Sequence, residues 1–123
     1  MPGLTINSIR AMENAQSNNT LQTKWYHYLL IFLAGVFLTN ILPHFINGIT
    51  GKSFPTPFAN PPGKGLSSPT LNVLWASINF LVGFSILFFV KIRERNKLIW
   101  IALFFGIIFM SFYLASYFGS LAV

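Results

Sequence analysis

A histidine and a few amides are the side chains of this sequence whose types and spacing could do chemistry. His44 follows Pro43 and comes one helical turn after Asn40, so a continuing helix would place His44 and Asn40 on one face. Because imidazole titrates near neutral pH, His44 could bind a ligand or sense protons at a membrane interface. The alternative, which we favour, is that its ring satisfies a carbonyl group released where Pro43 removes a helical hydrogen bond.

Two further amides lie within a long apolar segment. Asn72 and Asn79 recur with Ala76 and Gly83 at helical spacing and form a stripe of small and polar residues. A buried amide must find a partner in an apolar medium, and small residues let helices approach closely. The spacing predicts a helix-packing face, with a polar pathway or ligand cleft as the alternative. Similar stripes are expected elsewhere: Gly35 and Thr39 before it, and Ala102, Gly106, Tyr113, Ser116 and Ser120 after it.

The connector at residues 44–69 combines prolines with aromatic residues. Five prolines lie within the fifteen residues 55–69, and they hold the backbone near polyproline II and prevent a regular helix or sheet. Phe54 and Phe58 are unusual in a solvated loop. They either cover the ends of a helix bundle or form a docking site, and both interpretations stay open.

The acidic and thiol side chains that most enzymes and metal sites use are scarce. The chain has no Asp and no Cys, and its two carboxylates are Glu13 and Glu94. Carboxylate pairs, Ser-His-Asp triads and thiolate or carboxylate metal sites are therefore excluded. So is an acidic group at membrane depth, which proton- or cation-coupled transporters normally use. The sequence predicts no catalytic residue, no cofactor and no metal site.

Three charge-free stretches must position these groups. Residues 25–51, 65–90 and 98–123 contain no Lys, Arg, Asp or Glu, while the whole chain is 54% hydrophobic, with mean hydropathy +0.61. About 20 apolar residues cross a bilayer as a helix. We therefore predict an all-α integral membrane protein with three transmembrane helices. The predicted spans within a membrane domain 25–120 are about 25–43, 70–90 and 98–120, the second capped by Ser68 followed by Pro69.

The basic residues predict how the chain is threaded. The short loop 91–97 has four basic residues in seven, whereas the longer connector has only Lys52 and Lys64. The positive-inside rule then places loop 91–97 and the N-terminus in the cytoplasm, and the connector and the C-terminus outside. Residues 1–24 are expected to form a mobile polar tail with a short helical turn. The net charge of +6 comes largely from these flanks, so we expect no nucleic-acid partner.

The connector and its flanks carry a run of motifs: Pro43-His44-Phe45, Asn47-Gly48, Phe54, Pro57-Phe58-Ala59, Pro61-Pro62-Gly63, Ser67-Ser68-Pro69 and Asn72-Val73-Leu74-Trp75. On these residues, about a quarter of the chain, the sequence resembles a family of small bacterial inner-membrane proteins with no assigned activity. The resemblance implies a multi-pass protein of the plasma membrane, and it implies no mechanism.

These features lead to one predicted function and one alternative. Three helices bury little of their own surface, so we expect a homo-oligomer or a larger complex in the lipid bilayer. We predict a non-catalytic subunit or accessory protein that binds a partner or lipid through the outer loop 44–69. The alternative is a homo-oligomeric channel or transporter for small solutes, lined by Asn72, Asn79 and Tyr113.

Overall fold

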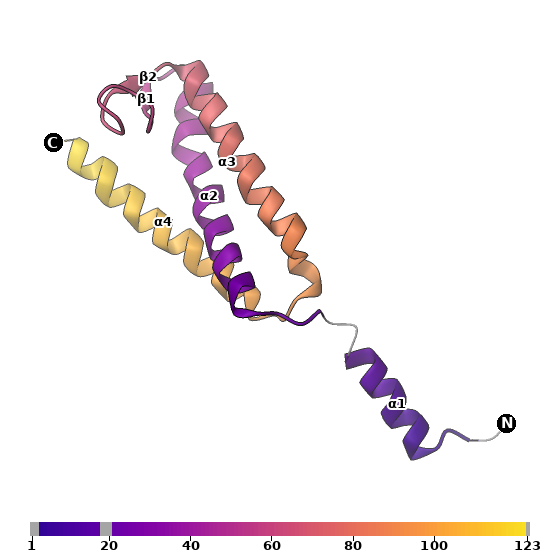
Figure 1. Cartoon of the computed structure of the whole chain (residues 1–123). Coiled ribbons are helices and arrows are strands. Elements are labelled where there is room, and N and C mark those ends of the chain that lie inside the picture. Colours follow the sequence, from indigo (N-terminus) through magenta and orange to yellow (C-terminus); the bar gives the residue numbers. More distant parts are fainter. Residues whose placement is uncertain (1–2, 18–20, 123) are drawn as a thin grey trace.

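The computed structural model describes residues 3–17 and 21–122. In chain order, their elements are α1 (Ile6–Ser17), α2 (Trp25–Ile49), β1 (Phe54–Pro55), β2 (Leu66–Ser67), α3 (Pro69–Val90), the 3₁₀ helix η1 (Ile92–Glu94) and α4 (Ile99–Leu121) (Figure 1). Within the described residues, three helices are long and apolar enough to cross a membrane, namely α2, α3 and α4. The prediction of a mainly helical chain with three such helices is confirmed.

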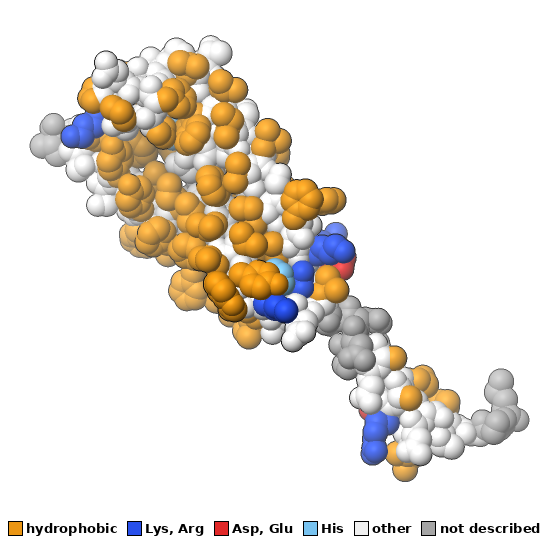
Figure 2. Space-filling view, viewed as in Figure 1, with side chains coloured by type: hydrophobic (Ala, Val, Ile, Leu, Met, Phe, Trp, Pro, Cys, Tyr) orange, Lys and Arg blue, Asp and Glu red, His pale blue; other side chains and the backbone are white. Residues whose placement is uncertain are grey.

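α2 is the central helix of the bundle. It packs against both α3 and α4, whereas α3 and α4 hardly touch each other over their described lengths. Figure 1 shows α3 and α4 diverging from the turn between them, on opposite sides of α2. Figure 2 shows hydrophobic side chains spread over the surface of the bundle, with Lys and Arg gathered near its ends. Such a surface is compatible with three helices that cross a membrane.

Two glycines set the crossing of α2 and α4. A Cβ added at Gly35 would lie 2.6 Å from the carbonyl oxygen of Leu103, and one added at Gly106 would overlap the carbonyl oxygen of Phe32. Backbones can approach this closely only without side chains between them. Gly35 and Gly106 therefore pack as the stripes predicted. Beyond Gly106 the stripe does not continue as a packing face, because α4 diverges from α2: Tyr113, Ser116 and Ser120 are exposed.

α2 continues past Pro43 to Ile49, further than the predicted end of the first span near residue 43. Packing explains the extension. Gly48 is buried, and a Cβ there would lie 2.6 Å from Val73 Cγ2 and 2.8 Å from the carbonyl oxygen of Pro69, on α3. Asn47 Nδ2 also donates to the carbonyl oxygen of Pro43 at 2.7 Å. Tertiary contact thus carries the helix beyond the residue that would end it in isolation.

The second helix begins as its sequence predicts. Ser68 is the N-cap of α3, its side-chain oxygen accepts from the backbone N–H of Leu71 at 3.2 Å, and Pro69 occupies the first helical turn. At the other end of α3, a small core of buried side chains closes the turn into α4: Ile31, Val90, Ile92 and Ile99. This core therefore fixes the end of α3 and the start of α4 on either side of the turn.

The residues before α2 are attached to the α3–α4 turn. Arg95 donates from Nε to the carbonyl oxygen of Val90 at 2.8 Å and from Nη1 to that of Gln22 at 2.7 Å. The backbone N–H of Leu21 donates to the carbonyl oxygen of Glu94 at 3.1 Å. α1 is a 12-residue helix, longer than the short turn expected in the tail. Residues 18–20 of that tail lie outside the described residues.

Candidate functional site

The connector between α2 and α3 folds back on itself. β1 and β2 pair antiparallel with Phe54 opposite Ser67 and Pro55 opposite Leu66, and the buried hydroxyl groups of Thr56 and Ser67 lie 2.5 Å apart. The expectation that the prolines prevent any sheet was therefore wrong in this detail. Each strand has only two residues, so Pro55, which has no N–H to donate, is tolerated at a free edge.

Asn72, on the first turns of α3, holds this connector against the helices. Its Nδ2 lies 3.0 Å from the carbonyl oxygen of Phe54, 3.2 Å from that of Ser67 and 3.1 Å from that of Ser68. The Asn72 side chain is 0% exposed. All of its donor capacity is therefore used on backbone groups in and next to the connector.

α4 holds the other side of the connector. Tyr117 donates its hydroxyl to the carbonyl oxygen of Gly63 at 2.7 Å, and the rings of Phe118 and Phe54 pack with centroids 4.5 Å apart. Gly63 has φ of +74°, and an added Cβ would lie 2.6 Å from the Tyr117 hydroxyl oxygen, so glycine is required twice over. The connector thus spans the gap where α3 and α4 diverge, and Phe54 is part of a cap over the helix ends.

Phe58 plays a different part from Phe54. Its ring meets the edge of Trp75 at a centroid distance of 5.8 Å, but the side chain remains 51% exposed. Phe54 therefore fits the cap interpretation, while Phe58 presents an apolar surface outside it. The docking interpretation stays a prediction for Phe58.

His44 is bonded to Asn72, not to a carbonyl group released by Pro43 as we expected. Its Nδ1 lies 2.8 Å from Asn72 Oδ1, and the side chain is 3% exposed. Because Asn72 Nδ2 is committed to carbonyl groups, Oδ1 must accept, and Nδ1 of His44 must carry the hydrogen. In the neutral ring, Nε2 is then an acceptor, and among the described residues it has no hydrogen-bond partner.

A second amide pair joins α2 to α3 one level deeper. Asn79 Nδ2 donates to the carbonyl oxygen of Trp75 at 2.7 Å, and Asn79 Oδ1 accepts from Asn40 Nδ2 at 3.1 Å. Asn79 is 2% exposed, and Ala76 and Gly83 of the same stripe are also buried. The stripe of α3 therefore lies against α2 within one chain. Asn40 donates through its Nδ2, and among the described contacts no group donates to its Oδ1.

A cavity of about 370 Å³ lies under the connector. α2 contributes Asn40 and His44, and α3 contributes Trp75. The remaining lining comes from the connector (Pro55, Thr56, Pro57, Pro62, Gly63) and from α4 (Met110, Tyr113, Leu114, Tyr117, Phe118). None of these described lining residues carries a charge. The walls are therefore mostly apolar and aromatic, with a few polar atoms between them, as in many small-molecule sites.

One buried polar atom beside this cavity has no partner. Trp75 Nε1 is buried, and no described residue accepts its hydrogen. Tyr113 stacks on Tyr117 with centroids 6.2 Å apart and is 53% exposed. Sequence reasoning missed Trp75, Tyr117 and Phe118 as parts of this site. Helical spacing could have found two of them, since Trp75 comes three residues after Asn72 and Tyr117 four after Tyr113.

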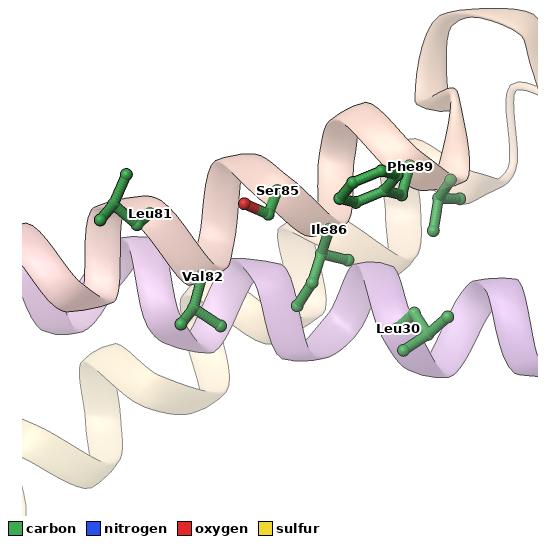
Figure 3. Close-up of a pocket in the computed structure, with 7 residues that line it drawn as sticks. Leu30, Leu81, Val82, Ser85, Ile86 and Phe89 are labelled. Carbon is green, nitrogen blue, oxygen red and sulfur yellow. The ribbon is translucent and has the colours of Figure 1, made fainter.

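A second groove, between α2 and α3 near the α3–α4 turn, serves as a contrast. It has a volume of about 430 Å³ and is lined by Leu30, Leu81, Val82, Ser85, Ile86, Phe89 and Val90 (Figure 3). Ser85 supplies the one polar side chain in that lining. Such a groove suits an acyl chain but offers little to recognise a particular molecule, so the cavity under the connector is the candidate site.

Among residues 3–17 and 21–122, no group of three or more His, Cys, Asp or Glu side chains could hold a metal ion. In comparisons with known proteins, the chain matched no family model, no curated protein and no solved structure. Function is therefore argued from the geometry of the cavity.

Proposed function

We propose that this chain is a non-catalytic multi-pass membrane protein that binds a lipid or similar amphiphile in the cavity under the α2–α3 connector. The observation that carries the proposal is the double attachment of the connector, to α3 through Asn72 and to α4 through Tyr117. A loop that served only as a spacer would not need both. The attached loop covers a cavity with apolar walls and a few polar atoms, which is the composition that suits an amphiphile.

The threading predicted from charge belongs to the same proposal. The α3–α4 turn and the segment 21–24 would face the cytoplasm, and the connector and the C-terminus would lie outside the plasma membrane, in a bacterium the inner membrane. Three of the basic residues at the turn end, Lys91, Arg93 and Lys97, are exposed, as positive-inside anchors would be. The cavity would then open toward the outer leaflet. Alkaline phosphatase fused after Val123 should be active, and the same fusion at Arg93 should be inactive.

Association with copies or with other membrane proteins is also proposed, because α4 is largely uncovered. Its phenylalanines Phe104, Phe105, Phe109 and Phe112 are exposed. Alternatively, a protein partner could bind the connector. The exposed ring of Phe58 favours this second candidate function, because it offers such a partner an apolar contact. Photocrosslinking from position 58 in intact membranes would distinguish a protein bound at the connector from lipid, since a protein partner gives a discrete larger band and lipid does not.

A homo-oligomeric pore lined by Asn72, Asn79 and Tyr113 is the less supported alternative. A pore needs its polar side chains to face water, whereas Asn72 and Asn79 are buried and bonded to α2 within one chain. Purified oligomer in liposomes should therefore show no flux of small solutes. Flux that is lost in Asn79→Leu would favour the pore instead.

The lipid proposal is tested by what remains bound. Protein purified in a mild detergent and examined by native mass spectrometry should retain one lipid per chain through delipidation. Tyr117→Phe removes the hydroxyl that attaches the connector to α4 and should lower that retention, whereas the matched Tyr26→Phe, at the other end of the bundle, should not. Equal retention in both variants, or no retained lipid in the unmodified protein, would contradict the proposal.

A further inference from the structure

We propose that a groove at the α3–α4 turn binds one anionic phospholipid, whose acyl chain lies along α3 and whose phosphate group meets Lys91 and Arg93. This turn groove has a volume of about 500 Å³ and is formed by the last turns of α3 and by η1. It lies at the opposite end of α3 from the connector, so the inference goes beyond the proposed ligand of the cavity there.

The apolar part of the turn groove comes mainly from α3. Phe84, Leu87 and Phe88 line it, and because they are three and four residues apart they share one face of the helix. Phe89 and Ile92 complete the apolar lining. Phe88 and Phe89 are each 77% exposed, so no other described element covers them. This end of α3 therefore offers uncovered apolar side chains along which an acyl chain can lie.

Two cations stand where the apolar face ends. Lys91 and Arg93 line the turn groove and are exposed, and no described carboxylate pairs with either of them. Lys and Arg side chains gather at this end of the bundle (Figure 2). Cations at a membrane surface attract anionic lipids. A free phosphate would use the cations and leave the apolar side chains uncovered, so the combination favours a phospholipid.

The acidic residue in the lining does not reverse this charge. Glu94 also lines the turn groove. Residue 24 and the loop 91–97 together carry five basic residues against that one carboxylate, and segment 21–24 is bonded to the loop through Leu21 and Arg95. The local field is therefore positive, and Glu94 should weaken the binding of an anion without preventing it.

The end of a helix usually disfavours an anion, because its last carbonyl groups are unpaired. In α3 several of these groups already have donors. The backbone N–H of Lys91 donates to the carbonyl oxygens of Leu87 and Phe88, and Arg95 Nε donates to that of Val90 at 2.8 Å. This pairing reduces the negative potential that a phosphate group would meet beside Lys91.

The backbone of Lys91 gives an independent reason to assign its side chain a role. Lys91 has φ of +55° and ψ of +55°, the left-handed conformation in which many helices end and for which glycine is the usual residue. Among the described residues it is the one residue other than glycine with positive φ. Its ammonium group makes no described hydrogen bond or ion pair. The fold would thus be served better by glycine, whereas a bound phosphate group requires the lysine.

The test measures lipid binding to the whole purified protein by native mass spectrometry. Dioleoyl phosphatidylglycerol and dioleoyl phosphatidylcholine have the same acyl chains and differ in net charge. The anionic lipid should bind about tenfold more tightly, roughly the effect of one to two basic residues at a membrane surface. Glycerol phosphate, which has the charge without the chains, should not compete with it.

Substitutions locate the effect at the turn groove. Lys91→Gly should weaken phosphatidylglycerol binding by about fivefold without lowering the melting temperature, and Arg93→Gln should weaken it by about as much. The matched control is Lys97→Gln, which removes the same charge from the same loop but outside the groove lining, and should weaken binding by less than about twofold. Glu94→Gln should strengthen it. If Lys91→Gly does not fold, the comparison of Arg93→Gln with Lys97→Gln decides by the same criterion.

Three results would overturn the inference. Equal binding of the two lipids would remove the selection by charge, and equal losses in the groove variants and in Lys97→Gln would reduce it to a general attraction of the loop. Competition by glycerol phosphate would exclude the acyl chain from the site. Failure here is separable from failure of the proposed function, because Tyr117→Phe at the connector should leave the preference for phosphatidylglycerol unchanged.

Discussion

Replacing Asn72 with leucine should release the connector while leaving the three-helix bundle in place. The change removes the donor to three carbonyl groups and leaves the Nδ1–H of His44 buried without an acceptor. The carbonyl of Ser68 keeps the backbone N–H of Asn72, so the main losses are at Phe54, Ser67 and His44. An unpaired buried donor costs about 1–3 kcal/mol and a lost neutral bond about 0.5–1.5, so the connector loses roughly 2–6 kcal/mol.

Trypsin supplies the assay, because Lys52 and Lys64 lie in the connector. In nanodiscs, cleavage there requires the connector to leave the helix ends, and each 1.4 kcal/mol lost raises the open population tenfold. Asn72→Leu should accelerate cleavage by at least tenfold. The control is Asn79→Leu, the same substitution two turns along α3, which breaks one bond within α3 and one to the half-buried Asn40. Its cleavage rate should change less than threefold. Similar rates for the two variants would refute the anchoring role of Asn72.

Three further predictions concern the bundle and its threading. Gly106→Ala should lower the melting temperature of the purified protein, because overpacking against the carbonyl of Phe32 costs about 1–3 kcal/mol, whereas Gly119→Ala, with open space around it, should be neutral or slightly stabilising. Arg95→Ala should speed hydrogen exchange in residues 21–24 by removing two charge-assisted bonds, and Arg93→Ala, for which no such bond is found among the described contacts, should not. A cysteine added after the last residue should react with a membrane-impermeant maleimide in intact cells, and modification only after lysis would reverse the threading.

The three long helices and the N-cap of α3 could be predicted from sequence because the signals for them are local. Charge-free runs of sufficient length gave three membrane-compatible helices, and Ser68 before Pro69 gave the start of α3. The stripe through Asn72 and Asn79 predicted a packed face, and that face does lie against α2. Each of these predictions depends on residues within a few helical turns of one another.

The features that local signals could not supply depend on contacts between distant residues. Pro43 marks a helix end in isolation, yet α2 continues because Gly48 lies against Val73. The predicted stripe on α4 packs against α2 at Gly106 but not beyond it. Residue spacing along one helix does not show where that helix leaves its neighbour, so the sequence could not reveal this limit. The attachment of Gly63 by Tyr117 joins residues 54 positions apart, and no pattern in either segment indicates it.

The polar residues of the cavity end are explained by the way they join the connector to the helices. Asn72 is 0% exposed and uses its N–H bonds on backbone carbonyl groups, so its Oδ1 would be a buried acceptor without a donor unless α2 supplied one. His44 supplies that donor through Nδ1, and its ring also packs against Phe54 and Phe118. A phenyl ring at position 44 could keep the ring packing, but it would leave Oδ1 unpaired at a cost of about 1–3 kcal/mol. The imidazole therefore completes the network that holds the connector to α2, α3 and α4.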